Sequence, residues 1–228
     1  MIENLDVHGL ITVRAPNVTI RKSIVRGGIV TGNRGVITNY GYDNLLVEDV
    51  DVIPAYDTVW QDAIKGSDFT LNRVYVTGNV DSVKVHPDGN VLIKNSLLEN
   101  TTYYSSDPNQ NGGPTHNDGV QVRGGPNIRI VNNTIRGQQN MPVLGAANQR
   151  DASGLIIENN WLDGGHCTVK LQEVNGFQLT ASVRNNEFGP NRTVSNCKIA
   201  ATNGSSVTDG GNSMEATGVA VGILWVAS

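Results

Sequence analysis

Acidic, imidazole and cationic side chains gather in two short segments, DSVKVHPDG at residues 81–89 and THNDGVQVRGG at residues 115–125. Valines alternate with polar residues in both segments, which predicts two strands with one polar face each. Lys84 and His86 lie on that face in the first strand, and Gln121 and Arg123 lie on it in the second. Such groups can exchange protons, and Arg and Lys pair well with the carboxylates of acidic sugars.

Two reactions fit these residue types. Elimination from a uronate needs a cation beside the sugar carboxylate, a base and an acid. Hydrolysis needs two carboxylates on either side of the glycosidic bond, and Asp81 and Asp118 are the candidate pair. Carboxylates such as Asp81, Asp88 and Asp118 could alternatively hold Ca²⁺, although the sequence defines no metal site. The predicted catalytic residues are Lys84, His86, Asp88, His116, Asp118 and Arg123.

Further polar and aromatic residues are predicted to bind the substrate. The long segment at residues 101–118 carries two tyrosines, whose rings could stack on sugars. The alternative is a plain solvated surface, because Asp before Gly is ordinary turn chemistry and outward polar residues are normally hydrated. The predicted substrate-binding residues are Lys65, Asp81, Gln121, Lys170, Gln172, Tyr103 and Tyr104.

A repeat runs through the chain and must position these groups. Seven copies of one alternating pattern begin at residues 18, 45, 69, 91, 128, 155 and 182. The third residue of each of the first six copies is apolar, and a valine fills the matching place in the shorter last copy. These residues are Ile20, Val47, Leu71, Ile93, Ile130, Ile157 and Val183. A period near 25 residues with alternation inside each unit predicts stacked strands, and the spacing of leucine-rich repeats is absent.

A second strand column is expected in each repeat unit. It comprises ITVR from Ile11, AIK from Ala63, VKVH from Val83, VQVR from Val120, VKLQ from Val169 and KIA from Lys198. A third, shorter strand is plausible but poorly marked. The corner residues Asn95, Asn132, Asn159 and Asn185 align, as do Ser96, Asn133, Asn160 and Asn186. Stacked Asn side chains can bond from unit to unit, and Asn tolerates a left-handed bend.

Stacked strands of this period with Asn-rich corners resemble the pectate-lyase-like right-handed parallel β-helix superfamily, from about Ile11 to Cys197. The resemblance implies an all-β solenoid of about 7–8 turns with an asparagine ladder. It also implies an extracellular or virion-surface protein that binds, and as a lyase or hydrolase cleaves, an acidic polysaccharide. No catalytic set of a single family maps onto the chain, and fold alone does not give function.

Composition narrows the partners. The 228 residues carry a net charge of −4 and contain no long basic run, which argues against nucleic acid. No apolar stretch is long enough to span a membrane, and the first residues show no signal peptide. The opposing hypothesis is therefore a non-catalytic structural or receptor-binding virion protein of the tail or decoration type, for which a homotrimer or larger assembly is expected.

The cysteines and the C-terminal segment leave alternatives open. Cys167 and Cys197 align one unit apart, and a buried pair of thiols is expected, with a disulfide as the alternative. Residues 1–200 are expected to form the β-helix. Residues 201–228, with an apolar stretch around Trp225, are expected to cap its end or to form an oligomer contact within the same domain.

Overall fold

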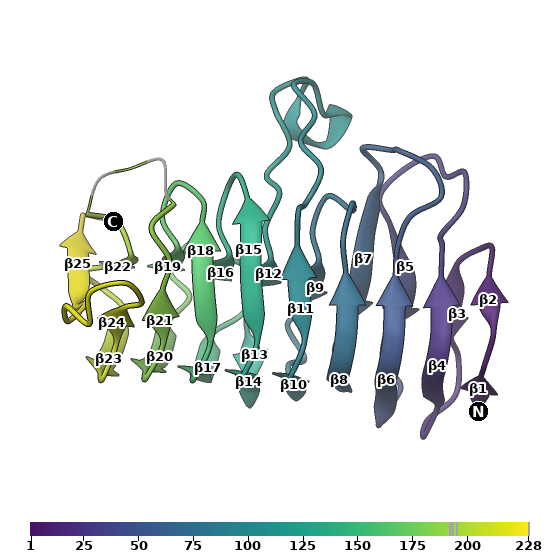
Figure 1. Ribbon diagram of the computed structural model, residues 1–228, viewed down its shortest axis with the longest axis horizontal. Helices are drawn as coiled ribbons and strands as arrows, with labels where there is room; N and C mark the ends of the chain where they lie inside the picture. The colour runs from purple at the N-terminus through teal and green to yellow at the C-terminus, as the bar shows by residue number, and fades with distance from the viewer. Residues whose placement is uncertain (192–193, 195, 228) are drawn as a thin grey trace.

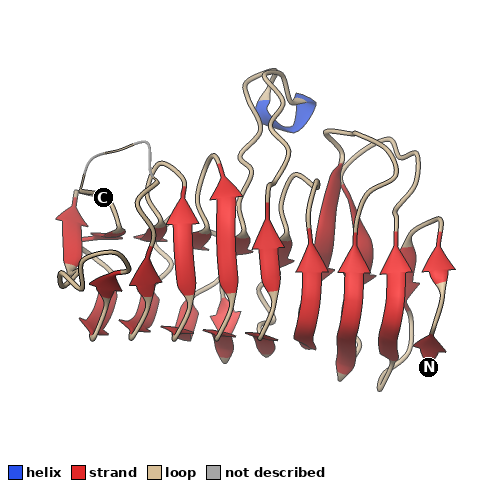
Figure 2. Cartoon of the chain, viewed as in Figure 1, coloured by secondary structure: helices blue, strands red, loops and turns tan. Residues whose placement is uncertain are grey.

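The computed structural model is an all-β parallel solenoid of about 8 turns, here called rungs. It describes residues 1–191, 194 and 196–227. Strands from successive rungs stack side by side along the length of the molecule (Figure 1). Within the described residues the only helical element is one short 3₁₀ turn, Pro108–Gln110, in the loop that projects from the body (Figure 2).

Three strand columns make up each rung. The first column contains β1 (Ile2–Glu3), β4 (Thr19–Val25), β6 (Leu45–Val52), β8 (Phe69–Val76), β10 (Val91–Lys94), β14 (Ile128–Val131), β17 (Ala152–Glu158), β20 (Leu179–Arg184) and β23 (Ser206–Gly210), with β13 (Gly125–Pro126) beside β17. The third, shorter strand that the sequence indicated only weakly forms a column of its own. It contains β2 (Asp6–Val7), β11 (Leu97–Glu99), β15 (Thr134–Gln138), β18 (Trp161–Gly164), β21 (Glu187–Phe188) and β24 (Ser213–Met214). The long strands β4, β6 and β8 pass through both columns.

The remaining column is a separate sheet, called sheet B. It contains β3 (Ile11–Val13), β5 (Arg34–Asn39), β7 (Gln61–Gly66), β9 (Val83–Val85), β12 (Val120–Val122), β16 (Val143–Ala147), β19 (Val169–Glu173), β22 (Ile199–Thr202) and β25 (Ile223–Val226). The predicted second column omitted β5, β16 and β25. The sequences of β5 and β16, RGVITN and VLGAA, lack clear alternation, and both strands are largely buried.

The predicted repeat is confirmed at residue level. Ile20 pairs with Val47, Val47 with Leu71, and the same register continues to Val183. All seven repeat positions are fully buried, so the core is a set of stacked Val, Ile and Leu side chains. Burying these apolar side chains in every rung is the main driving force for stacking.

The asparagine ladder is present, and the two aligned Asn columns have different roles. Asn95, Asn132, Asn159 and Asn185 have φ between 54° and 57°, so they supply the left-handed bend. The neighbouring column is the ladder. Asn133 N and Nδ2 donate to Asn160 Oδ1 at 2.9 and 3.0 Å, and Asn160 repeats this pattern with Asn186.

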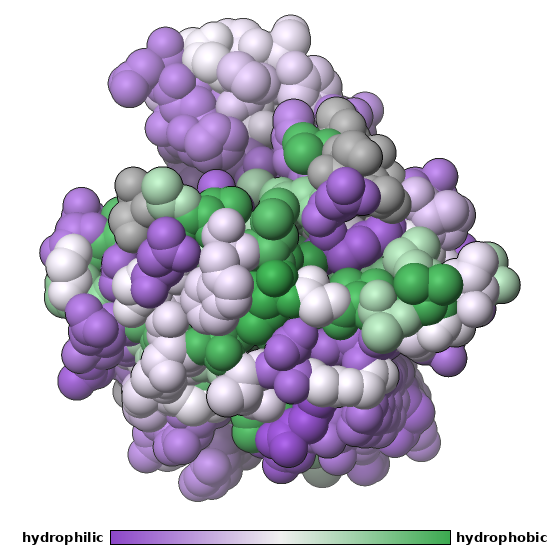
Figure 3. All heavy atoms as spheres, turned by 90° about the vertical axis from the view of Figure 1, so that its left-hand side faces the viewer, coloured by the Kyte–Doolittle hydropathy of each residue, from purple (hydrophilic) through white to green (hydrophobic). Residues whose placement is uncertain are grey.

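The two cysteines form a disulfide between neighbouring rungs, with Cα atoms 4.7 Å apart. The expectation of two free thiols is therefore wrong, because the parallel stacking brings these positions within bonding distance. Residues 201–227 continue the solenoid, since β23 pairs with β20 and β25 pairs with β22. Figure 3 views this end, where apolar side chains lie in the centre and Leu224 and Trp225 are partly exposed. Among the described residues, no helix is long and apolar enough to cross a membrane.

Candidate functional site

Three aspartates stack where the strands of sheet B begin. Asp62 lies in β7, and Asp81 and Asp118 occupy the matching positions just before β9 and β12. Backbone hydrogen bonds join neighbouring rungs at these positions, since Ala63 N donates to Asp81 O and Ser82 N donates to Asp118 O. These three residues, called the aspartate column, are each 2% exposed or less.

Two lysines neutralise part of this column. Lys84 Nζ lies 2.7 Å from Asp81 Oδ2 and 3.1 Å from Asp62 Oδ2. Lys65 Nζ lies 2.9 Å from Asp62 Oδ2 and also donates to Asn33 Oδ1. Because the Lys65 and Lys84 side chains are only 7% and 13% exposed, both ammonium groups are committed to internal ion pairs.

The third aspartate has a different environment. Asp118 Oδ1 accepts hydrogen bonds from Asn140 Nδ2 at 2.8 Å and Met141 N at 3.1 Å, whereas Oδ2 is buried without a hydrogen-bond partner. Burial, and then the charge of Asp81, raise the pKa of Asp118 well above its usual range. Burial also raises the pKa of Asp81. For Asp62, burial is outweighed by Lys84 and Lys65, and the pKa falls.

His86 and Arg123 lie at the other end of the sheet B strands, directly after β9 and β12. The His86 ring meets the Tyr40 ring edge-on at a centroid distance of 5.0 Å. Burial, and then the positive charges of Arg123, Lys65 and Lys84, lower the pKa of His86 to about 4. A histidine with this pKa is neutral at physiological pH and can accept or donate a hydrogen bond without carrying charge.

The other predicted residues of this sheet are dispersed. Gln121, Lys170 and Gln172 are half-buried on sheet B, but Leu144 of β16 lies between Gln121 and Lys170 in the register. Asp88 lies beyond the end of β9, where its carboxylate is 3.5 Å from Arg150. The predicted catalytic residues are therefore distributed over both ends of sheet B and the projecting loop.

The aspartates do not fit a Ca²⁺ site. Asp81 and Asp118 already accept bonds from lysine, amide and backbone donors, and Asp88 lies on the surface beside an arginine. Among the described residues there is also no group of three or more His, Cys, Asp or Glu side chains that could hold a metal ion.

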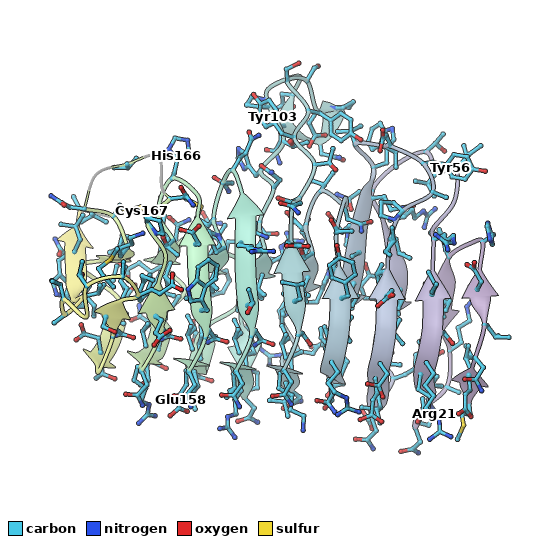
Figure 4. All side chains as sticks on the ribbon, viewed as in Figure 1. Arg21, Tyr56, Tyr103, Glu158, His166 and Cys167 are labelled. Atoms are coloured by element: carbon cyan, nitrogen blue, oxygen red, sulfur yellow. A yellow bond between two sulfur atoms is a disulfide. The ribbon has the colours of Figure 1, made fainter. Side chains whose placement is uncertain are left out.

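A cleft lies beside the projecting loop, at the corner where sheet B begins. This cleft has a volume of about 940 Å³. The loop supplies one wall, and the corners of the next rungs supply the other. It is lined by Tyr103, Pro114, Thr115, His116, Asn117, Gly137, Gln138, Gln139, Asn140, Asp163, Gly164, Gly165, His166, Pro190 and Asn191. Tyr103 and His166 are labelled at this edge in Figure 4.

Local hydrogen bonds hold both walls of the cleft. In the projecting loop, Thr115 N donates to Tyr104 O and Tyr104 N donates to Thr115 Oγ1, both at 3.0 Å. On the opposite wall, Asp163 accepts bonds from Asn191 N and Nδ2, both at 2.7 Å. The cleft is therefore shaped by paired loop strands and a buried carboxylate, which favours a preformed site.

Of the predicted residues, Tyr103 and His116 line this cleft. Tyr104 does not line the cleft, and its hydroxyl is buried without a hydrogen-bond partner. Burial, and then the charge of Asp57, raise the pKa of Tyr104. Gln139, Asn140, Asp163 and His166 also line the cleft but were not predicted from the sequence. Their common signal is position, because Gln139 and Asn140 follow β15, Asp163 lies near the end of β18 and His166 follows it, where the chain turns toward sheet B.

The cleft carries amide, hydroxyl, imidazole and carboxylate groups with one exposed aromatic ring. Comparison of the chain with protein-family models, with curated protein sequences and with solved structures gives no match.

Proposed function

We propose that this protein binds an extended polysaccharide in the cleft beside the projecting loop. The observation that carries the proposal is the lining of the cleft, where Tyr103 lies among amide and imidazole side chains. Sugars bind through hydroxyl hydrogen bonds and through stacking on aromatic rings, and this lining offers both. The resemblance to the pectate-lyase-like β-helix superfamily supports the same ligand class.

Binding is better supported than cleavage. Hydrolysis by Asp81 and Asp118 would require both carboxylates to reach the ligand, yet they are 1% and 0% exposed. Lys84 is held between Asp81 and Asp62, which leaves it poorly placed to neutralise a substrate carboxylate. Within the cleft, the imidazoles of His116 and His166 are the groups suited to acid–base chemistry.

Non-catalytic attachment to a glycan surface is the second candidate function. The burial of Asp81, Lys84 and Asp118 favours it, because such a protein needs a binding site but no reactive groups. A virion tail or decoration protein, extracellular in action and assembled as a homotrimer, would be one setting for this activity.

The test is a panel of neutral and acidic polysaccharides incubated with the purified chain. Binding is measured by retardation in affinity gels, and cleavage by new reducing ends and by the ultraviolet absorbance of unsaturated sugar ends. Retardation by at least one polymer supports the proposal. Cleavage products that disappear in His116→Ala or His166→Ala would identify an enzyme, and binding without products would identify an attachment protein. Absence of binding to every polymer would contradict the proposal.

A further inference from the structure

The side-chain amides that line the cleft mostly donate their hydrogen bonds inside the protein. Five amide residues line it, and the amide nitrogen of four of them has an internal acceptor. These bonds run from Asn117 Nδ2 to Thr101 Oγ1, from Gln138 Nε2 to Leu98 O, from Asn140 Nδ2 to Asp118 Oδ1 and from Asn191 Nδ2 to Asp163 Oδ2. The amide donors of the cleft are therefore largely committed before a ligand arrives.

Acceptor oxygens remain unpaired on two of the same amides. Asn117 Oδ1 and Gln138 Oε1 are buried and have no hydrogen-bond partner, and the two residues are only 1% and 3% exposed. A buried carbonyl oxygen without a donor is destabilising. The floor of the cleft is therefore rich in acceptors, and it favours a ligand that brings hydrogen-bond donors.

The charged groups around the cleft act in the same direction. Asp163 contributes a carboxylate, and neither lysine nor arginine is among the lining residues that the structure describes. Two cations of adjoining segments are engaged elsewhere, since Arg136 pairs with Glu99 at 2.7 Å and the buried Lys198 donates to Gly189 O. An ionised carboxylate only accepts hydrogen bonds, so an acidic sugar in this cleft would meet acceptors and a like charge.

We propose that the cleft binds a neutral glycan and discriminates against uronic acids. The hydroxyl and acetamido groups of neutral sugars carry hydrogen-bond donors, and Tyr103 adds an exposed ring for stacking (Figure 4). A sugar carboxylate would lose its water without gaining a cation, so the same lining disfavours acidic chains. This inference rests on the proposed binding of polysaccharide in the cleft, and it favours a neutral ligand over the acidic one predicted from the sequence.

The test compares three acidic polymers, polygalacturonate, alginate and hyaluronan, with their carboxyl-reduced forms. Affinities are measured at about pH 8, where imidazoles are ordinarily uncharged. Tyr103→Ala shows whether binding occurs in the cleft. Gln139→Lys adds a cation at an exposed position of the lining, and Gln178→Lys adds the same charge at an exposed position that does not line the cleft. Arg192, next to Asn191 in the sequence, lies outside the described residues and is tested as Arg192→Gln. Thermal melting confirms that all variants fold.

We expect at least one neutral form to bind about tenfold or more tightly than its acidic parent, and this binding should weaken in Tyr103→Ala. Gln139→Lys should narrow the preference by about threefold or more, because the added ammonium group can pair with a carboxylate. Gln178→Lys and Arg192→Gln should leave the preference unchanged.

Three results would contradict the inference. An acidic form that binds more tightly than its neutral partner, and that depends on Tyr103, would overturn it and leave the proposed function in place. Binding of an acidic form that falls about tenfold in Arg192→Gln would also overturn it, because that arginine would then supply the cation. Absence of binding by every polymer would contradict the proposed function and this inference together.

Discussion

Two buried polar columns run along the same solenoid, and they are satisfied in different ways. The asparagine ladder runs from Asn133 to Asn212 through bonds between like side chains, and Ser96 N donates to its first member. The aspartate column spans only Asp62, Asp81 and Asp118, and it depends on lysine, amide and backbone donors from elsewhere. Both lie at corners of the rungs, yet only the first repeats without interruption.

The difference follows from the hydrogen-bonding groups. A side-chain amide has donors and an acceptor, so each Asn can donate to the next while its own oxygen accepts from the previous one. An ionised carboxylate only accepts, and stacked carboxylates repel one another. A carboxylate column therefore needs cations or protons, and its stability depends on pH, whereas the amide column is expected to be insensitive to pH.

The largest expected effect comes from removing the shared cation. Lys84→Met leaves Asp81 buried without its ion-pair partner, so we expect a loss of about 3–5 kcal/mol in the free energy of unfolding at neutral pH. Chemical denaturation measures it. Adding Asp81→Asn to this variant should recover a large part of the lost stability, because the buried unpaired charge is removed. A Lys84→Met protein as stable as the unmodified chain would show that the lysine does not support the column.

Breaking the asparagine ladder should lower the free energy of unfolding somewhat less than Lys84→Met does. Asn160→Ala removes bonds to Asn133, Asn186 and the Ile130 carbonyl, so buried donors lose their acceptor. We expect a loss of about 3 kcal/mol by the same measurement, with little change between acidic and neutral pH. The control is Asn127→Gly in an exposed ladder, where Asn127 Nδ2 donates to Asn90 Oδ1 and a φ of 54° suits glycine, and where we expect a loss of about 0.5 kcal/mol. Similar losses at both positions would contradict the importance of burial.

Asp118→Asn should have a smaller effect of opposite sign. The pKa of Asp118 is raised in the folded state, so the protonated form of Asp118 stabilises the fold. This stabilisation is complete at pH values below the pKa of Asp118 in the unfolded chain. It is lost as the pH rises through the pKa of Asp118 in the folded chain. The amide cannot ionise, so this variant should be more stable at neutral pH by about 1 kcal/mol and should lack that decline. Thermal melting across pH measures the difference. Asp88→Asn, an exposed aspartate, is the control, and an equal gain there would contradict the assignment.

The smallest expected effect concerns His86. Its pKa is lowered to about 4, so the unfolded chain binds a proton on the histidine before the folded chain does. Stability should therefore fall as pH drops from the usual histidine pKa of about 6.5 toward 4, by roughly 1 kcal/mol or less after solvent screening. NMR titration of the ring should place its pKa below the usual histidine value of about 6.5. A normal His86 titration would show that the ring is more accessible than its packing indicates.

The repeated features of the fold could be predicted from sequence. Alternation and period identify the core positions, and aligned Asn residues identify the ladder, because each copy reports the same local requirement. The strand β16 escaped prediction since Gly145 and Ala146 replace the alternating pattern. Bends at Lys22 and Arg73 were also not recognised, because Lys and Arg rarely mark a left-handed backbone.

The candidate site was less predictable because it depends on contacts between rungs and loops. The alternation placed Lys84 on an outward position, but it could not show that Asp62, from 22 residues earlier, would bind the ammonium group. Nor could it show that His166 and Asn191 would face the same cleft as His116 and Tyr103. Register across rungs decides these neighbours, and three-dimensional stacking sets that register.

The proposed binding of polysaccharide in the cleft is tested most directly by a comparison of two tyrosines. Tyr103 and Tyr56 are 45% and 51% exposed, but only Tyr103 lines the cleft, and Tyr56 lies away from it in Figure 4. The measurement is the affinity of Tyr103→Ala and Tyr56→Ala for whichever polymer binds the unmodified chain. We predict about a tenfold loss for Tyr103→Ala and no significant change for Tyr56→Ala. Equal affinities for both variants and the unmodified chain would contradict binding in the cleft.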